Sequence, residues 1–381
     1  MGHTADRSRA EQVIATARTF ARERIDPDAA RWERDRRLPR EAITAAAAEG
    51  LCGLLVPTEL GGAGLGVSDM AEVMGALAYA DMGLAFSLVC HNNLAGAIAK
   101  KGSDLHRARH LDAMLDGSTL GAFLLTEPGT GSDAAAIITS AIAHGDRWVL
   151  NGEKAWVTNA TEAGLLNVYA QTEPGAGSRG IAAFLVRTDQ PGVIREDAYE
   201  MLGAHATGTG SFRFENVDLD ADQLFVPAGL AFRAAMEAID IARIVVSAMC
   251  AGMLHRGLKT AVEYIKNRQA FGAPLSERQG LQWMLADVAT DLEASIALAR
   301  AASAALDEGD PTMGVRAAHA KKFATRVTMD GLLQCMQALG ANGFRHDRPL
   351  ARHLAGAKMA QYLDGTTEIQ NVVIARSLFD T

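Results

Sequence analysis

The spacing of apolar residues changes twice along the chain, and this change limits the possible folds more than any other feature. Up to about residue 119, apolar side chains recur three or four residues apart, which is the spacing of helices with one buried face. They then alternate with polar residues, as in strands, before helical spacing returns. This order predicts a multidomain α+β protein with an N-terminal helical domain (1–119), a middle β domain (120–228) and a C-terminal helical domain (229–381).

The middle segment has the features of an antiparallel β structure. Residues 147–158 form two alternating stretches around Asn151 and Gly152, a pair typical of the tight turn in a hairpin. No helical pattern lies between the later alternating stretches at 181–186 and 211–219. We therefore expect an antiparallel β-barrel-like domain, and not the parallel sheet of nucleotide-binding folds.

The last third of the chain is typical of long amphipathic helices. A helix of ~30 residues is ~45 Å long, and rods of this length usually pack as a bundle, often against copies of themselves. The apolar spacing predicts helices over residues 231–267, 277–307, 311–340, 348–362 and 367–378.

Composition and charge exclude several classes of function. The formal net charge of −8 argues against binding to a nucleic acid backbone. The four cysteines lack the spacing of a zinc site or a disulfide framework, so we expect no metal; they are Cys52, Cys90, Cys250 and Cys335. The first 25 residues mix charges with apolar residues, and no run of 18 apolar residues follows. We expect a cytoplasmic protein with no membrane span.

The glycine-rich stretch at 61–66 matches neither a dinucleotide fingerprint nor a Walker loop, so we interpret it as a loop between helices.

Four other short segments have side chains suited to a bound ligand. Because no nucleophile-and-base set or metal motif occurs, any chemistry should belong to a cofactor. Taken singly, each of the four segments has a structural explanation of equal or greater weight: an ordinary turn for 126–133, a core tryptophan for 156–159, a cation at a helix C-terminus for 268–272 and a helix N-cap for 364–370.

Together these segments resemble the acyl-CoA dehydrogenase family, and the resemblance spans almost the whole chain. The matching stretches, in order, are VPTELGGAG (56–64), LLTEPGTGSD (124–133), NGEKAWVTN (151–159), RQAFGAPL (268–275), QALGANGF (337–344) and GTTEIQ (365–370). The resemblance implies an N-terminal helical domain, a middle β-barrel-like domain and a C-terminal four-helix bundle, in agreement with the periodicity. The segments 90–94 and 154–160 are most similar to those of short-chain, butyryl-type members.

The resemblance implies an FAD site shared between subunits of a homotetramer or dimer. Thr126 and Ser132 would contact the flavin and phosphates, and Trp156 and Thr158 the isoalloxazine ring. The pyrophosphate and adenine would be held from the neighbouring subunit by Arg268, Phe271, Gln279, Gln337 and Gly340. The adenosine ribose would be closed in by Thr366 and Glu368. The substrate would contact Ser132, Asp240, Arg243 and Gly365.

The expected activity is α,β-dehydrogenation of a short or branched acyl thioester, carried by coenzyme A or by an acyl-carrier protein. In this family a carboxylate removes the α-proton, the β-hydride passes to the flavin, and electrons go on to electron-transfer flavoprotein or another acceptor. The position of the base, normally Glu before Gly-Thr, is Asp364 here. Some relatives carry the base on the first long helix of the bundle, where this chain has Ala242.

Two departures from the family pattern affect this expectation. Asp is one methylene shorter than Glu, so its carboxylate lies ~1.5 Å further back. The family's Arg-Asp-Ala-Lys is replaced by Ala355-Gly356-Ala357-Lys358 just before the acid. The alternative is a flavoenzyme of the same fold with other chemistry, such as a flavin monooxygenase, an N-hydroxylase or a thioester desulfinase, although a carboxylate at 364 disfavours it.

Overall fold

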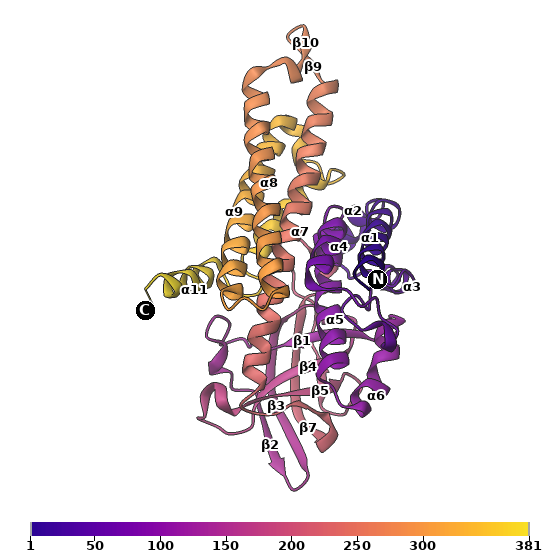
Figure 1. The fold of residues 1–381 in the computed structure, drawn as a ribbon, viewed down its shortest axis with the longest axis vertical. Coiled ribbons are helices and arrows are strands. Elements are labelled where there is room, and N and C mark those ends of the chain that lie inside the picture. The colour runs from indigo at the N-terminus through magenta and orange to yellow at the C-terminus, as the bar shows by residue number, and fades with distance from the viewer. Residues whose placement is uncertain (1, 380–381) are drawn as a thin grey trace.

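The computed structural model describes residues 2–379, and its first part is a set of helices beside the lower half of a long bundle (Figure 1). The helices are α1 (Gly2–Phe20), α2 (Ala29–Asp35), α3 (Arg40–Ala48), α4 (Val67–Ala78), α5 (Met82–Lys101) and α6 (Asp104–Leu115). α3 ends at Ala48, and Gly50 turns the chain with a φ of 75°. Residues 61–66 form a loop between helices, as predicted.

The second part is an eight-stranded sheet at the base of the molecule (Figure 1). The strands are β1 (Leu120–Leu124), β2 (Ser140–His144), β3 (Arg147–Val157), β4 (Ala163–Gln171), β5 (Ile181–Arg187), β6 (Val193–Arg195), β7 (Gly210–Asp220) and β8 (Leu224–Val226). Their order is β6-β7-β3-β2-β4-β5-β8, with β1 on β4. The sheet is mainly antiparallel, but the β1–β4 pair is parallel, with Leu124 opposite Val168, and β2 meets β4 in parallel at one position. The expectation of a purely antiparallel sheet is corrected in this respect.

The predicted hairpin turn at Asn151-Gly152 is wrong. β3 runs without a break through both residues, and the turn lies earlier, at residues 145–146 between β2 and β3. Gly152 has a φ of 137°, the register against β7 shifts beside it, and a Cβ there would lie 2.6 Å from Thr139 Oγ1. The glycine is therefore needed for a β-bulge and a close approach of two strands, the other common use of glycine in a strand.

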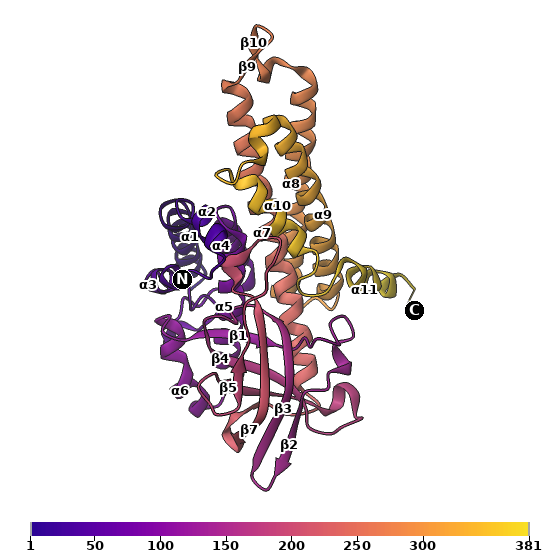
Figure 2. The ribbon, with the colours of Figure 1, turned by 180° about the vertical axis from the view of Figure 1, so that it is seen from behind.

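The third part is the helical bundle, which extends away from the sheet (Figures 1 and 2). Its helices are α7 (Ala231–Asn267), α8 (Gln279–Asp307), α9 (Met313–Leu339), α10 (Pro349–Ala360) and α11 (Thr367–Phe379). A small hairpin of β9 (Gln269–Ala270) and β10 (Ala273–Pro274) forms its far tip. The five predicted helices are all present. α11 projects from the body, and Gln370 is its one buried residue.

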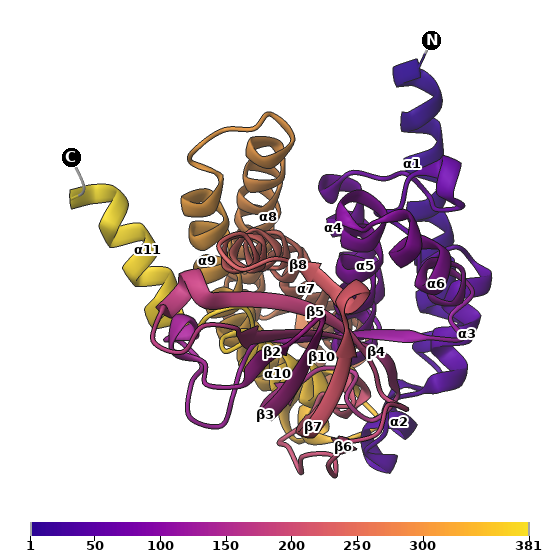
Figure 3. The ribbon, with the colours of Figure 1, turned by 90° about the horizontal axis from the view of Figure 1, so that it is seen from below.

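α7 is the central helix of the molecule. Viewed from below, it lies between the N-terminal helices and α8 and α9 (Figure 3). α5 and α7 are long and apolar enough to cross a membrane, but 83% and 61% of their most apolar windows are buried inside the protein. The apolar composition of α5 and α7 is therefore explained by their packing in the protein core.

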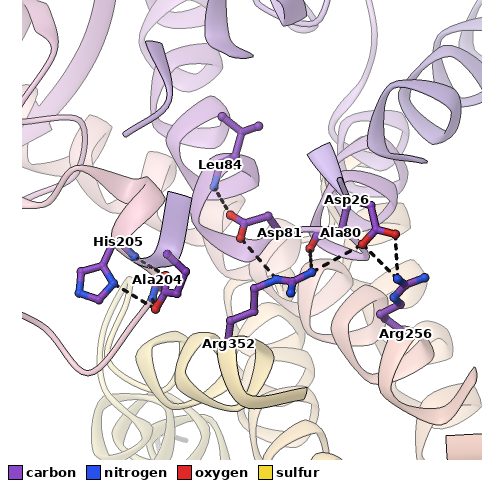
Figure 4. A network of polar contacts seen from close by, with 9 residues as sticks. Asp26, Ala80, Asp81, Leu84, Ala204, His205, Arg256 and Arg352 are labelled. Carbon is purple, nitrogen blue, oxygen red and sulfur yellow. Dashed lines mark hydrogen bonds and ion pairs between the residues drawn. The ribbon is translucent and has the colours of Figure 1, made fainter. Parts of the chain in front are cut away.

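Ion pairs connect the N-terminal helices with the helical bundle (Figure 4). Arg352 of α10 lies 3.9 Å from Asp81 at the start of α5, 3.6 Å from Asp26, and donates to the Ala80 carbonyl at 3.1 Å. Arg256 of α7 contacts both oxygens of Asp26, at 2.8 and 3.0 Å. These contacts tie the N-terminal helices to α7 and α10.

Candidate active site

An apolar cavity of about 170 Å³ lies between α5 and α7 above the sheet. Cys90, Leu94 and Ala97 line it from α5, at the three- and four-residue intervals of one helix face. Ala238 and Ala242 line it from α7. The cavity therefore follows the groove between two helices, and small side chains on α7 leave it open.

The cavity has two chemically different ends. At one end Asp364 lines it, close enough to Cys90 for its charge to raise the pKa of the thiol, an effect second to that of burial. At the other end Lys101 of α5 pairs with Glu237 of α7 at 3.0 Å, and both side chains are about half exposed. Asp364 is thus the carboxylate at the less exposed end, whereas Glu237 is already paired at the solvent end.

The main chain around Asp364 is firmly held. Asp364 and Gly365 both have left-handed backbone angles, with φ of 51° and 90°. Arg243 Nε donates to the Asp364 carbonyl at 2.8 Å, and Lys321 Nζ donates to the Gly365 carbonyl at 2.5 Å. The carboxylate itself is not held in this way, because its buried Oδ2 has no hydrogen-bond partner among the described residues.

Burial raises the pKa of Asp364 to about 6, and the nearby charges of Lys321 and Arg243 limit the rise. Burial also lowers the pKa of Lys321 to about 8, partly offset by Asp364. At neutral pH the Asp364 carboxylate is ionised, with one oxygen free to accept a proton. Ala242 lines the same cavity, so the alternative position for a base offers no carboxylate.

The shortened side chains before Asp364 have a visible packing effect. A Cβ on Gly356 of α10 would lie 3.0 Å from Met82 Cγ and 3.2 Å from Met253 Sδ. A Cβ on Gly203 would meet Ala355 Cβ at 2.6 Å. α10 therefore packs closer to α5 and α7 than a larger residue at 356 would allow, in the segment that leads directly to Asp364.

The loop after β1 is fixed by a buried ion pair that sequence reasoning missed. Lys154 Nζ lies 2.8 Å from Glu127 Oε1 and donates to the Leu125 carbonyl at 2.9 Å, while Glu127 also accepts from the N–H groups of Ile138 and Thr139. Burial alone would raise the pKa of Glu127, but Lys154 and the Ile138 N–H hold it below its ordinary value. The available signal was an acid in the motif 124–133 and a lysine in the motif 151–159.

This loop presents the first predicted cofactor residues. Thr126 is half-buried and Ser132 is exposed. A Cβ on Gly129 or Gly131 would meet nothing within 4 Å, and the buried hydroxyl of Thr130 has no partner among the described residues. Backbone N–H groups and hydroxyls on an open, anchored loop suit a phosphate-bearing ligand.

Trp156 and Thr158 lie near the end of β3 and take different positions. Trp156 has a φ of 57°, and 63% of it is exposed, with its ring 4.7 Å from that of Tyr199. Thr158 is buried and lies next to Cys90, at the Asp364 end of the cavity. An exposed aromatic face beside a buried hydroxyl at the cavity end fits a flat ring system such as a flavin.

Two further groups of predicted residues lie close to Asp364 in the chain or in space. Thr366 and Glu368 begin α11, where Thr366 is half-buried and Glu368 is exposed. Asp240, Arg243 and Gly365 lie together beside Asp364, where Asp240 pairs with Arg243 at 2.8 Å. Ser132 is on the exposed loop, so the structure does not place it with those three.

The third set lies at the far tip of the bundle, at the opposite end from the sheet (Figure 1). Its members are all exposed; they are Arg268, Phe271, Gln279, Gln337 and Gly340. Phe271 is 94% exposed and has a φ of 54°. Within one chain these residues do not meet Thr126 or Trp156, and their assignment to the cofactor of a second chain stays a prediction.

Comparisons with known proteins agree with this geometry. Family models match the chain as the acyl-CoA dehydrogenase N-terminal domain over residues 8–118, the middle domain over 122–217 and the C-terminal domain over 231–379. The chain is 35% identical over 369 residues to the short-chain specific acyl-CoA dehydrogenase of Homo sapiens mitochondria, covering 97% of this chain and 89% of that protein.

Solved structures give the same result. Butyryl-CoA dehydrogenase from Megasphaera elsdenii superposes with a TM-score of 0.93 at 31% identity, covering 97% of this chain and 98% of that one. The prolyl acyl carrier protein oxidase AnaB superposes with a TM-score of 0.91 at 25% identity, covering 98% and 99%. The anchored loop, the exposed Trp156 and the cavity with its free carboxylate fit the cofactor of this group. The chain belongs to the acyl-CoA dehydrogenase family of FAD-dependent oxidoreductases.

Proposed function

We propose that this enzyme converts a short or branched acyl thioester into the trans-2-enoyl thioester, with Asp364 as the base that removes the α-proton. The observation that carries the proposal is the buried, unpartnered Oδ2 of Asp364 at the less exposed end of an apolar cavity. A carboxylate with a raised pKa near 6 is suited to accept a proton at neutral pH.

The residues of this chain would bind the acyl group, position the base and remove the proton. The apolar walls from α5 and α7 bind the acyl chain and exclude water. Arg243 and Lys321 hold the carbonyls of Asp364 and Gly365, so the carboxylate is aimed without being neutralised by a direct hydrogen bond. Asp364 Oδ2 takes the α-proton and carries it until the product leaves. FAD, when bound, supplies the acceptor for the β-hydride.

The alternative chemistries of this fold need no base at this position. The reactions of a monooxygenase, an N-hydroxylase or a desulfinase do not require an ionised carboxylate at position 364, where Arg243 and Lys321 fix the main chain. The free oxygen of Asp364 therefore favours dehydrogenation.

The carrier and the electron acceptor are part of the same proposal. The named relatives act on acyl-CoA or, for AnaB, on a prolyl acyl carrier protein, so both thioester carriers are candidate substrates. We propose electron-transfer flavoprotein as the acceptor, because the exposed face of Trp156 offers a route to the ring edge.

The direct test is anaerobic addition of acyl thioesters to the purified yellow protein. Butyryl-CoA, isobutyryl-CoA and the butyryl carrier-protein thioester should bleach the flavin absorbance and yield the enoyl product. Bleaching by none of them, in a protein that holds FAD, would contradict the proposed function.

The shared cofactor site can be tested separately with Arg268→Ala. Arg268 is exposed at the bundle tip, so its loss should leave the fold of one chain intact. If it holds the cofactor of a neighbouring subunit, FAD content should fall several-fold and the tetramer or dimer should weaken with it. Arg326→Ala, an exposed cation on α9, is the matched control. Unchanged FAD affinity and assembly in Arg268→Ala would show that the residue is misplaced.

A further inference from the structure

The apolar cavity contains polar side chains that the proposed reaction does not use. Asn167 and Tyr169 of β4 and Asn93 of α5 all line it. Asn167 is 5% exposed, and its Nδ2 makes one long contact, 3.4 Å, with the Tyr169 hydroxyl. The buried Oδ1 atoms of Asn167 and Asn93 have no hydrogen-bond partner among the described residues.

The neighbouring Asn92 shows what a structural asparagine looks like in the same helix. Asn92 is fully buried, accepts from the Leu54 N–H at 2.7 Å, and donates to the carbonyls of Leu51 and Leu88, both at 2.9 Å. Asn93 faces the cavity instead and has none of these bonds for its Oδ1. Buried amide groups are rarely left unpaired, because the loss of hydration is costly. Two unsatisfied amides on one cavity therefore indicate a ligand with a polar group.

A hydroxyl group fits these side chains better than a charged group does. Both amides are neutral, and the cavity's charged residues are Asp364 at one end and the lysines and Glu237 at the other. A hydroxyl both donates and accepts, so it can pair with either face of an amide and with the Tyr169 hydroxyl. An ammonium or carboxylate between them would lack a counter-ion.

The helix spacing gives the place of this group along the acyl chain. Asn93 lies three residues after Cys90, which is about 4.5 Å along α5. Cys90 lies beside Asp364, where the α-carbon would be. An extended acyl chain advances roughly 1.25 Å per carbon, given C–C bonds of about 1.5 Å. The polar group then falls about four carbons beyond the α-carbon.

We infer that the preferred substrate is an acyl thioester with a hydroxyl group near its fifth or sixth carbon, which hydrogen-bonds to Asn167 and Asn93. This inference rests on the proposed function and names the substrate class of the same site.

The test compares hexanoyl-CoA with 5-hydroxyhexanoyl-CoA and 6-hydroxyhexanoyl-CoA in anaerobic flavin bleaching of the FAD-loaded enzyme. The wild type should show a kcat/KM about tenfold or more higher for one of the hydroxy substrates. Asn167→Leu and Asn93→Leu should each reduce this preference about tenfold, mainly by raising kcat/KM for hexanoyl-CoA and lowering it for the hydroxy substrate. Ile241→Val, which changes an apolar wall of the cavity on α7, is the control and should leave the ratio unchanged.

The two hypotheses fail in different ways. Bleaching by butyryl-CoA, with no preference for a hydroxy substrate and no change of ratio in either variant, would overturn the inference while leaving the proposed function in place. Absence of bleaching by every thioester would contradict the proposed function and the inference with it. Because Asn93 is only half-buried, its variant provides the test if Asn167→Leu does not fold.

Discussion

Asp81 is buried and Asp364 is half-buried, and desolvation raises the pKa of each to about 6, yet their surroundings differ. Asp81 caps α5 by accepting from the Leu84 N–H at 2.9 Å, and its second oxygen lies 3.9 Å from Arg352 in the network of Figure 4. Asp364 has its backbone carbonyl bound by Arg243, and its Oδ2 has no partner within the described chain.

The comparison separates a structural acid from a reactive one. Both carboxylates have the same direction of pKa shift, so the shift alone does not distinguish them. The difference lies in where the hydrogen bonds go. At Asp81 they go to the side chain and fix a helix end. At Asp364 they go to the main chain and leave the side chain available to a substrate.

The largest difference between the two acids should be in the chemical step. Asp364→Asn should slow flavin bleaching by butyryl-CoA about 10²- to 10⁴-fold, because the amide keeps the volume but cannot accept the proton. FAD content and the melting temperature should stay near those of the wild type, since Oδ2 has no partner to lose. Asp81→Asn, the same substitution at the structural acid, should leave the bleaching rate within about twofold. Equal slowing in both variants would remove the distinction.

A smaller difference should appear in the dependence on pH. The Asp364 base must be ionised, and its folded pKa is about 6. The rate of bleaching should therefore be full above pH 7 and about tenfold lower at pH 5, as the carboxylate takes up a proton. Asp81→Asn should keep this profile. A rate that does not change between pH 5 and pH 7 would exclude Asp364 as the titrating group.

The smallest effect should be on stability, and it should belong to Asp81. Asp81→Ala removes the cap of α5 and should lower the free energy of unfolding by about 1 kcal/mol. Because burial raises the folded pKa of Asp81 above its unfolded value, its contribution to stability is larger below that pKa and is lost as pH rises through 6. Thermal unfolding should therefore show a larger deficit of the variant at pH 5 than at pH 7. A larger deficit at pH 7 would contradict the raised pKa.

The sequence allowed the arrangement of the domains to be predicted, but not the details of the sheet. Long helices were recognised because their apolar spacing persists over many residues, and all five C-terminal helices are present. The turn placed at Gly152 was wrong, because a glycine in a strand can mark either a turn or a bulge. Only the close approach of Thr139 decides between them, and Thr139 is distant in sequence and is brought close by the pairing of β2 with β3. The parallel β1–β4 pair was missed for the same reason.

The candidate site was predicted as residue types and not as an arrangement. Asp364 was proposed as the base from its position before Gly-Thr, which stays a prediction, and FAD was predicted from the ordered motifs. Lys321, which holds the Gly365 carbonyl, was missed because it lies 44 residues before its partner on another helix with no motif around it. The free Oδ2 of Asp364 and the unsatisfied amides of Asn93 and Asn167 depend on the packing of α5, α7 and β4, which local sequence does not specify.

The most direct test of the role of Asp364 is exchange of the substrate's α-proton with solvent deuterium, followed by NMR on a thioester incubated with the FAD-loaded enzyme. The wild type should exchange the α-proton, and Asp364→Asn should do so about 10²- to 10⁴-fold more slowly while still binding the thioester. Exchange by Asp364→Asn at a rate close to that of the wild type would show that the base lies elsewhere.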